Sequence, residues 1–531
     1  MYTYKEGCVF QSLDDIKGKN ITVMGLGLNG GGLASVRFFL KYGAFVIVTD
    51  MKTEEQLSPT IEALSKDDAV CKDRLKYVLG CHRLEDFENA DCVIKNPGVK
   101  IEGNKYLAAA RAIETDISIF LHFTKSPIIA VTGSKGKSST VSAIHYGLNK
   151  AGFTCFLGGN ITVSPLSFLE KTNENTPVVL ELSSWQLADL RGRKVLKPRI
   201  AIITKIVPDH LNWYGNMDDY IADKRLIYAD QTKGDYTIVD YDGDEVGTGP
   251  CDSENGTEKY GGAKTWGDFF ASETHGTVLR YTKNSVLESV YGVYQEGDGS
   301  GFAGKAILPN GKTPITILKT LAVPGEHTKI NVLNAALVLY LMNVPPENII
   351  KIMSEWQGVE HRLQFFYSYK NENMTVRFFN DSCATVPEAA REASQAFGKP
   401  VVLITGGTDK GLSFDVLVKT LSAKEAKEGG DEIPPKALYL LSGTGTDKML
   451  FELDKNGVHY FGPYTSLEEL LFDLKKNLGD RDDVAEEEGK NEERDDEIVV
   501  FSPGATSFGM FANEFDRGNQ FMNRVKAIFK D

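Results

Sequence analysis

Short apolar runs that end in polar turns recur along this chain and predict buried β-strands. Residues 21–24, 127–131, 178–180 and 200–204 are almost wholly apolar and lack the alternation of a half-exposed strand. After the run at 127–131, apolar positions keep helical spacing through residues 141–148. Strands that alternate with helices in this way predict an α/β fold with parallel sheets.

The same alternation divides into three modules, which suits a chain of 531 residues. We expect domains at residues 1–115, 116–360 and 361–531. From about 240 to 321 the chain is rich in Gly, Thr and short β-like runs, which we assign to antiparallel strands and loops of the middle domain. The acidic stretch 477–497 has almost no large apolar residues, so we expect a solvated loop inserted within the third domain.

Composition is that of a soluble globular protein, with 42% hydrophobic and 25% charged residues. The formal net charge of −14 argues against a nucleic-acid partner, since such proteins cluster Lys and Arg. No apolar run is long enough to cross a bilayer and the N-terminus carries no secretory signal, so we expect no membrane insertion. Seven cysteines without a CxxC pair do not suit a disulfide framework or a zinc site. We expect a cytoplasmic protein.

The run TGSKGKSS at residues 132–139 carries the clearest chemistry. It lies between a strand and a helix, where glycines let backbone N–H groups approach phosphate oxygens and the helix N-terminus adds favourable partial charge. Lys137 would reach the terminal phosphates of a nucleotide, and the Ser138 hydroxyl would ligate magnesium. A turn that binds nothing is the alternative, and it leaves the lysine and the hydroxyls without a purpose. The predicted nucleotide-binding residues are Gly133, Ser134, Lys135, Gly136, Lys137, Ser138 and Ser139.

Two more candidates follow strands of the same domain. Glu181 ends the run at 178–180, where a metal–nucleotide site takes its acidic ligand, although without the phosphate loop a helix-capping role would be favoured. His210 lies in the loop after the run at 200–204. A lone loop histidine is more often a surface residue than a metal ligand. A neighbouring strand that ends in Glu181 makes it more plausible that His210 is a metal ligand.

Lys224 lies in a predicted helix, on one face with Tyr220, Ile227 and Tyr228. A lysine among apolar neighbours is desolvated, which lowers its pKa and makes the neutral amine nucleophilic. Such an amine can take up CO2 as a carbamate and become a magnesium-binding anion. The alternative is that the methylene chain of Lys224 packs on the apolar face while its ammonium group reaches water. Periodicity alone favours this alternative.

The first domain has GLGLNG at residues 25–30 after its first strand, and Asp50 about 20 positions later. Taken alone, this pattern suggests a NAD-dependent oxidoreductase, but the same physics suits any nucleotide diphosphate. In the third domain, polar loops follow three strands, at residues 380–382, 406–410 and 502–504. We expect them to converge on one crevice that suits a small anionic substrate; structural turns are the alternative for each loop singly.

Together these motifs resemble the Mur ligase family over nearly the whole chain, and within it the glutamate-adding ligases. The shared motifs are GLGLNG, NPG, TGSKGKSST, GGN, ELSSWQL, PDHL, YIADKRLIY, the helix at His327, EHRL, NDSCAT, TGGTDKG and SPGATSFGMF. The resemblance implies an α/β protein of three domains: Rossmann-like at the N-terminus for a UDP-sugar, P-loop ATPase-like in the centre, and Rossmann-like at the C-terminus for an amino acid.

The resemblance also implies roles for single residues. The UDP-sugar would contact Gly27, Leu28, Asn29, Asp50, Lys52, Asn96, Gly98 and Asn160. Magnesium would be held by Ser138, Glu181, His210 and Lys224, the last as a carbamate. ATP would also contact His327, Asn331 and Arg362, and the catalytic set would be Lys137, His210, Lys224 and Arg362. The amino acid would contact Asp381, Thr385, Lys410 and Ser507.

The implied reaction is an ATP-dependent amide ligation in peptidoglycan precursor synthesis, with ATP and Mg2+ as cofactors. The carboxylate of UDP-N-acetylmuramoyl-L-alanine becomes an acyl phosphate, which the amine of glutamate, foremost D-glutamate, attacks. A ligase for L-glutamate or another amino acid is the alternative, and a NAD-dependent oxidoreductase a more distant one. The partners are then small molecules, and we expect a monomer.

The chain departs from the family at Cys383. Glutamate ligases often have NDSKATN where this chain has NDSCATV, so a positive charge is lost from the site. We interpret Cys383 as a packing substitute, since free cysteine behaves as a small hydrophobe. The stereochemistry of the glutamate therefore stays open on the sequence alone.

Overall fold

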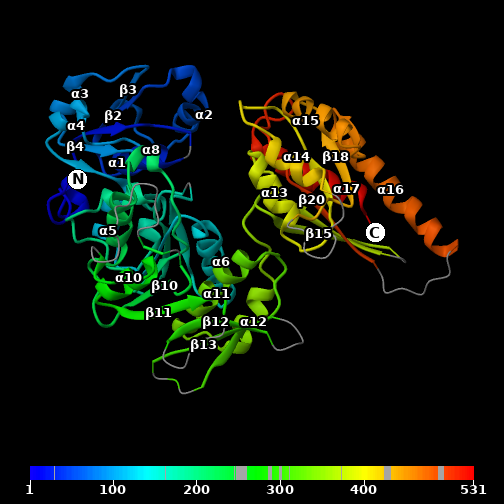
Figure 1. The fold of residues 1–531 in the computed structure, drawn as a ribbon. Helices are drawn as coiled ribbons and strands as arrows, with labels where there is room; N and C mark the ends of the chain where they lie inside the picture. The colour runs from blue at the N-terminus through cyan, green and yellow to red at the C-terminus, as the bar shows by residue number, and fades with distance from the viewer. Residues whose placement is uncertain are drawn as a thin grey trace. The chain divides into compact units, whose positions relative to one another are not determined.

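The fold is taken from a computed structural model of the chain. It describes residues 1–28, 30–161, 163–243, 245–246, 260–284, 290–297, 302–309, 311, 313–371, 374–423, 432–487 and 495–530. Two compact units are formed, one by Met1–Thr320 with Ile330–Ser354 and the other by Leu321–Lys329 with Glu355–Asp531. Each is described by itself below (Figure 1).

The first unit begins with a five-stranded parallel sheet in the order β3-β2-β1-β4-β5. Its strands are β1 (Asn20–Met24), β2 (Phe45–Asp50), β3 (Leu75–Leu79), β4 (Cys92–Lys95) and β5 (Ile113–Glu114). The helices of this part are α1 (Gly31–Lys41), α2 (Glu54–Ser65), α3 (Leu84–Glu88), α4 (Lys105–Ala109) and α5 (Asp116–Phe123). The strand order reverses between β1 and β4, where a crevice for a ligand opens in such sheets.

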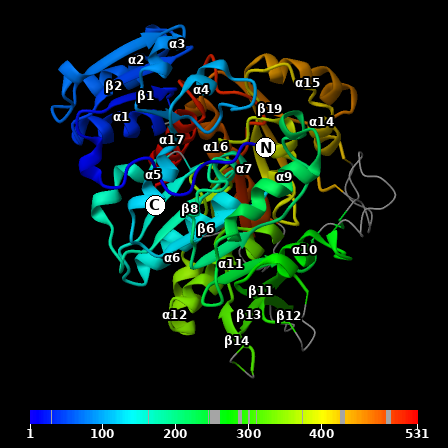
Figure 2. The ribbon, with the colours of Figure 1, turned by 90° about the vertical axis from the view of Figure 1, so that its left-hand side faces the viewer.

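A nine-stranded sheet follows in the same unit, in the order β14-β13-β12-β11-β10-β9-β6-β8-β7 (Figure 2). Its strands are β6 (Ile128–Thr132), β7 (Phe156–Gly159), β8 (Val178–Glu181), β9 (Ile200–Ile203), β10 (Tyr236–Asp240), β11 (Thr277–Thr282), β12 (Gly292–Gly297), β13 (Phe302–Ile307) and β14 (Ile315–Leu318). Its helices are α6 (Lys137–Lys150), α7 (Ser184–Ala188), α8 (Leu211–Tyr214), α9 (Met217–Lys224), α10 (Trp266–Glu273), α11 (Glu326–Leu341) and α12 (Pro346–Ser354). The first residues of α11, up to Lys329, belong to the second unit. Short 3₁₀ turns occupy Leu13–Ile16, Lys72–Arg74, Pro165–Ser167, Leu169–Lys171 and Arg225–Tyr228.

The expectation of antiparallel strands between about 240 and 321 is only partly correct. Strands β12, β13 and β14 pair antiparallel, but β11 pairs parallel with both β10 and β12, and helix α10 precedes it. A side-chain pattern sets which face of a strand is buried, but it carries no signal for strand direction.

The second unit holds a six-stranded sheet in the order β15-β16-β20-β17-β18-β19, parallel except for β15 at its edge. Its strands are β15 (Gln364–Lys370), β16 (Met374–Asn380), β17 (Val402–Thr405), β18 (Ala437–Leu441), β19 (Phe461–Tyr464) and β20 (Asp495–Phe501). Helices α13 (Pro387–Gln395), α14 (Asp415–Leu421) and α15 (Thr444–Lys455) pack on one face, and α16 (Leu467–Glu487) and α17 (Glu514–Ile528) on the other (Figure 1). The α/β class predicted from the sequence is confirmed.

The acidic stretch 477–497 is not the loop we expected. Helix α16 continues to Glu487 and β20 begins at Asp495, while residues 488–494 lie outside the described part of the chain. Buried leucines from Leu467 to Leu478 anchor the helix to the sheet, and once a helix is nucleated, Glu, Lys and Arg extend it readily. Within the described residues, none of the helices has both the length and the apolar character that crossing a bilayer would require.

Candidate active site

The phosphate loop joins β6 to α6 and depends on two glycines. Gly133 has a φ of +141° and Gly136, the residue before α6, a φ of +96°, both in the region that favours glycine. A Cβ on Gly133 would lie 2.0 Å from Thr204 Oγ1, and one on Gly136 would lie 2.4 Å from Asn331 Oδ1. The loop therefore has space only for glycine at both positions, and Asn331 of α11 lies against it.

Two lysines meet at one carbonyl oxygen of this loop. Lys137 Nζ donates to Gly133 O at 3.0 Å and to Ser134 O at 3.1 Å, while Lys224 Nζ donates to Gly133 O at 2.8 Å. Lys224 is buried at 2% exposure rather than reaching water. Burial, and then the charge of Lys137, lower the pKa of Lys224 well below its usual value. The Lys224 side chain is thus held beside the phosphate loop as a weakly basic amine.

Glu181 ends β8, the strand next to β6, and is buried at 2% exposure. Its Oε1 accepts a hydrogen bond from Asn160 Nδ2 at 2.8 Å, whereas Oε2 has no hydrogen-bond partner among the described residues. A buried carboxylate oxygen without a donor is unusual and suits a divalent cation. Within the part of the chain that is described, no three His, Cys, Asp or Glu side chains group to hold a metal ion. Other oxygen donors would have to complete a site at Glu181.

His210 lies at the start of α8 with a φ of +54°, and its side chain is about half exposed. The imidazole packs against Trp185 and Tyr220, with ring centroids 5.1 and 6.4 Å away. The Tyr220 hydroxyl lies 2.9 Å from Ser134 Oγ, so this aromatic group connects His210 to the phosphate loop. Sequence reasoning missed Tyr220 as part of the site, although it shares a helix face with Lys224.

The glycine-rich loop after β1 is held by Asp50. Oδ2 of Asp50 accepts the N–H groups of Leu26 and Gly27 at 2.9 and 3.1 Å, and Oδ1 accepts that of Lys52 at 3.0 Å. Asp50 is buried, so its carboxylate is engaged in shaping the loop. Leu28 is exposed, and Asn29 lies outside the described residues.

A cavity of about 300 Å³ opens at the switch point between β1 and β4. Its wall brings together Gly25, Asn96 and Gly98, from the loops after β1 and β4, with Asn160, which follows β7, and Trp185 of α7. Three of the predicted UDP-sugar contacts, Asn96, Gly98 and Asn160, therefore share one wall. We call this cavity the substrate groove.

In the second unit, the polar loops lie together at the carboxyl edge of the sheet. The N–H of Gly406 donates to Pro503 O and that of Thr506 to Thr408 O, both at 2.9 Å, which joins the loops after β17 and β20. Lys410 Nζ donates to Thr385 Oγ1 at 3.2 Å, so the loop after β16 joins them. Ser507, the residue after Thr506, is buried at 4% exposure. The expected convergence of the three loops is observed.

Asp381, in the loop after β16, has a partly buried carboxyl group. It accepts the Leu363 N–H at 3.0 Å and the Ser502 hydroxyl at 2.7 Å, and burial raises its pKa to about 7. Cys383 is half-buried, and burial raises the pKa of its thiol to about 11, so the thiol is neutral at physiological pH. This agrees with a packing role for Cys383.

Arg517 is a buried residue of this region that sequence reasoning missed. From α17 it donates to Ser382 Oγ at 3.0 Å, Ser382 O at 2.7 Å and Ala505 O at 3.0 Å, and so bridges the loops after β16 and β20. Burial lowers its pKa to about 10. The spacing of Arg517, Phe521 and Val525 along one helix face, with Phe521 and Val525 in the core, could have revealed it.

Two predicted ATP contacts, His327 and Arg362, belong to the second unit and are exposed there. Their approach to the phosphate loop of the first unit stays a prediction.

Comparison with known proteins places these features in a family. The model of the Mur ligase middle domain matches residues 131–339, and that of the Mur ligase MurD-like N-terminal domain matches residues 19–119. The UDP-N-acetylmuramoylalanine–D-glutamate ligase of Treponema pallidum (strain Nichols) is 37% identical, over 97% of this chain and 99% of its own length. The chain belongs to the Mur ligase family.

Other Mur ligases agree in sequence and fold. The enzyme of the same name from Borreliella burgdorferi (strain ATCC 35210 / DSM 4680 / CIP 102532 / B31) is 36% identical over 97% of this chain and 99% of its own. The UDP-N-acetylmuramate–alanine ligase MurC of Thermotoga maritima, at 17% identity, has a TM-score of 0.52 over 96% of this chain and 99% of its own. MurF of Acinetobacter baumannii, at 15% sequence identity, has a TM-score of 0.52 over 98% of this chain and 93% of its own. The structural likeness concerns the fold alone.

Proposed function

We propose that this Mur ligase joins D-glutamate to UDP-N-acetylmuramoyl-L-alanine with cleavage of ATP to ADP and phosphate, a cytoplasmic step of peptidoglycan precursor synthesis. The observation that carries the ATP-dependent part is the meeting of Lys137 and Lys224 at one phosphate loop, beside a strand that ends in Glu181. The amino acid is supported by relatives named as D-glutamate ligases at 37% and 36% identity over 97% of the chain.

The residues present fit a magnesium ion. Glu181 Oε2 is a buried acceptor without a donor, and Ser138 is in the first turn of α6 beside the phosphate loop. We propose that these two, with Lys224 as a carbamate and with His210, hold the ion. A neutral amine is the form that takes up CO2, and the burial of Lys224 favours that form. The carbamate would replace the neutral amine by an anionic oxygen donor, the kind of ligand that magnesium prefers.

The chain's own residues would then position substrates and neutralise charge. Backbone N–H groups at 133–139 and the Lys137 ammonium would hold the phosphates, with Arg362, His327 and Asn331 as further ATP contacts. Bound ATP supplies the phosphoryl group that activates the substrate carboxylate. The substrate groove would hold the UDP-sugar, with Gly27, Leu28, Asn29, Asp50 and Lys52 toward the nucleotide.

In the second unit, Lys410, Thr385, Ser507 and Asp381 would hold the amino acid. A lysine and hydroxyl groups at one edge suit the carboxylates of glutamate. The lysine expected at position 383 is absent, so Lys410 would be the main cation of this subsite.

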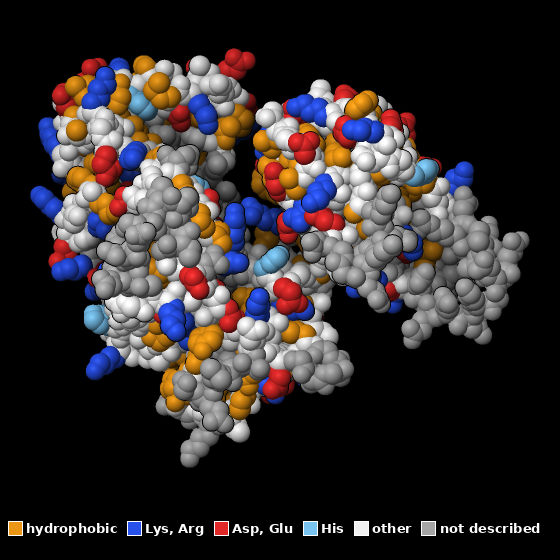
Figure 3. Space-filling view, viewed as in Figure 1, with side chains coloured by type: hydrophobic (Ala, Val, Ile, Leu, Met, Phe, Trp, Pro, Cys, Tyr) orange, Lys and Arg blue, Asp and Glu red, His pale blue; other side chains and the backbone are white. Residues whose placement is uncertain are grey.

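We propose that the chain acts as a monomer on small molecules, with domains at 1–115, 116–360 and 361–531, a division supported by one sheet in each. Both acidic and basic side chains are seen on each unit in the face of Figure 3. The absence of a nucleic-acid partner is proposed from the formal net charge of −14.

The deciding experiment measures phosphate release from ATP across a panel of D- and L-amino acids, with and without UDP-N-acetylmuramoyl-L-alanine. Release that needs both the UDP-sugar and D-glutamate supports the proposal. A preference for L-glutamate would show that the protein is the alternative, a Mur ligase that adds L-glutamate. Turnover that ignores the UDP-sugar would refute both.

A further inference from the structure

Lys95, the last residue of β4, is a buried lysine with no role in the site described so far. Its side chain is 2% exposed, and its Nζ donates to Asn96 O at 3.1 Å and to Val99 O at 2.9 Å, with Pro97 O 3.5 Å away. A single ammonium group thus gathers the carbonyl oxygens of Asn96, Pro97 and Val99 in the loop 96–99. Because it lies inside this turn, it fixes the curvature of the loop.

That loop forms part of the substrate groove. The N–H of Asn96 donates to Met24 O at 3.2 Å, and the N–H of Gly98 donates to Asn96 Oδ1 at 3.1 Å. A Cβ on Gly25 would lie 3.1 Å from Asn96 Cβ, so the loop packs directly on the glycine-rich loop after β1. A displacement of residues 96–99 would therefore alter both loops that face the groove.

The same ammonium group also reaches the segment that carries Glu181, a candidate magnesium ligand, and Trp185 of the substrate groove. Lys95 Nζ lies 2.9 Å from Asp189 Oδ2, and the Asp189 side chain is 6% exposed. Asp189 directly follows α7, and its N–H donates to Trp185 O at 3.1 Å at the end of that helix. Glu181 lies three residues before the start of the same helix. Lys95 is thus a direct link between the substrate loop and the segment 181–189.

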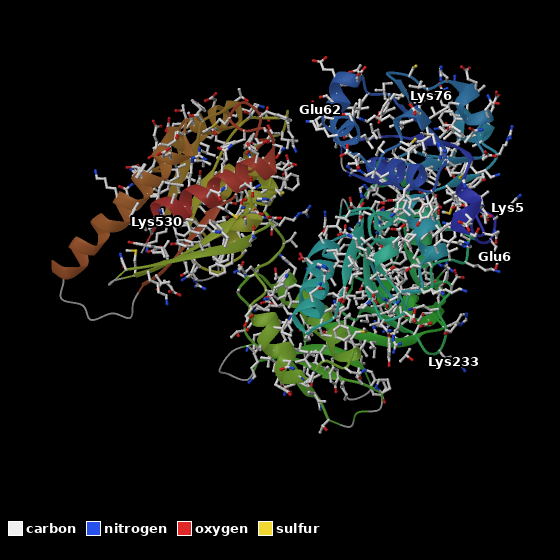
Figure 4. The ribbon with its side chains drawn as sticks, turned by 180° about the vertical axis from the view of Figure 1, so that it is seen from behind. Lys5, Glu6, Glu62, Lys76, Lys233 and Lys530 are labelled. Carbon is white, nitrogen blue, oxygen red and sulfur yellow. The ribbon has the colours of Figure 1, made fainter. Side chains whose placement is uncertain are left out.

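Residues near the N-terminus hold the other side of Asp189. The Tyr4 hydroxyl donates to Asp189 Oδ1 at 3.0 Å, and the Tyr4 N–H donates to Arg191 O at 2.9 Å. Further out, Glu6 pairs with Lys194 at 2.9 Å, on the surface where Figure 4 labels Glu6. Asp189 is therefore fixed from two sides, which makes it a firm anchor for Lys95.

A contribution to the stability of the fold does not by itself explain why a lysine is buried at position 95. A buried ion pair is weak evidence for stability, because apolar residues of similar volume often do as well. A second buried pair, Arg193 with Glu114 at 2.9 Å, already joins nearby segments, and both side chains are 3% exposed. Arg193 also donates to Asp189 O at 2.8 Å, so the pair is not wholly separate from the anchor. Among its described contacts Glu114 bonds neither to residues 96–99 nor to Asp189, so a substitution of Glu114 serves as the control.

We propose that Lys95 is a positioning residue for the UDP-sugar: it sets the shape of loop 96–99 and fixes that loop to the segment with Glu181 and Trp185. The inference rests on the proposed function, since the groove is assigned to the UDP-sugar there. Lys95 does not touch the reacting atoms. Its loss displaces the groove wall and leaves the phosphate loop in place.

The test compares Lys95→Met with Glu114→Gln, which disturbs the control pair. Lys95→Met raises the KM and the dissociation constant for UDP-N-acetylmuramoyl-L-alanine roughly tenfold or more and leaves the KM for ATP within about twofold. Glu114→Gln lowers thermal stability without changing either constant. Equal changes in the two variants, or a parallel rise in the KM for ATP, would overturn the proposal.

Two further variants separate position from stability. Asp189→Asn keeps the bonds from Lys95 to the loop, so it raises the KM for the UDP-sugar less than Lys95→Met does. The double variant Lys95→Met/Asp189→Leu removes the unpaired buried charge and regains thermal stability, yet the KM stays high. Recovery of the KM together with stability would show that Lys95 is merely structural. If the unaltered enzyme itself needs no UDP-sugar for turnover, the proposed function fails instead.

Discussion

Asp381 should make the stability of the second unit depend on pH, and Asp381→Asn should remove that dependence. The carboxyl is partly buried and accepts hydrogen bonds from the Leu363 N–H and the Ser502 hydroxyl. An asparagine keeps the shape, because its oxygen can accept the N–H and its amide can donate to the serine oxygen. The substitution therefore changes the charge of the group and little else.

The magnitude follows from the pKa of Asp381, which burial raises from 3.8 to about 7. An acid whose pKa is higher in the folded state contributes stability that is complete below 3.8 and is lost as the pH rises through about 7. At about 1.36 kcal/mol per pH unit, the two units between pH 5 and pH 7 remove roughly 2.5 kcal/mol, and the loss levels off by pH 8. Relative to Asp381→Asn, the unaltered protein becomes less stable by that amount from pH 5 to pH 8.

Urea unfolding at pH 5, 6, 7 and 8 would measure this difference. Hydrogen exchange of peptides from β16 and β20, read by mass spectrometry, reports on the second unit alone. The expected result is a free-energy difference between the two proteins that changes by roughly 2.5 kcal/mol across this range. A difference that stays constant with pH, or that grows in the opposite direction, would refute the reasoning.

Three other substitutions test the rest of the site. Lys224→Ala should reduce kcat by about 100-fold or more, and added short-chain carboxylates should restore part of it; unchanged turnover would reject the carbamate. Gly133→Ala places a Cβ 2.0 Å from Thr204 Oγ1, so the KM for ATP should rise roughly tenfold or more in steady-state assays, while the KM for the amino acid should not. Arg517→Met leaves Ser382 O and Ala505 O without their donor and should destabilise the second unit by about 3 kcal/mol in urea unfolding; a loss under about 0.5 kcal/mol would contradict its bridging role.

The strand-and-turn pattern predicted much of the site, because its chemistry follows strand ends. The phosphate loop, Glu181 and the loop after β9 come directly after apolar runs, and parallel strands bring such ends to one edge. The helix face of Lys224 showed its apolar neighbours, but periodicity favoured an ammonium in water, and the burial of the whole side chain was not predicted from it. Local pattern and local chemistry agree at the strand ends.

Long-range pairing was beyond the sequence. Nothing near Lys95 shows that Asp189 lies beside it, and nothing near Ser382 reveals Arg517, because each pair joins segments about a hundred residues or more apart. The predictions for the direction of β11 and for the length of α16 were wrong for another reason. The polarity of the residues shows neither which strand pairs with which nor how far a helix extends.

The engagement of Asp50 has a consequence for attempts to redesign nucleotide preference. In dinucleotide-binding folds, the acidic residue after the second strand is a common target for changing the cofactor, because it reads the ribose. Here the carboxylate accepts the backbone N–H groups of Leu26, Gly27 and Lys52. An exchange at this single position would collapse the loop before it altered selectivity, so a designer would first have to supply another acceptor for those three groups.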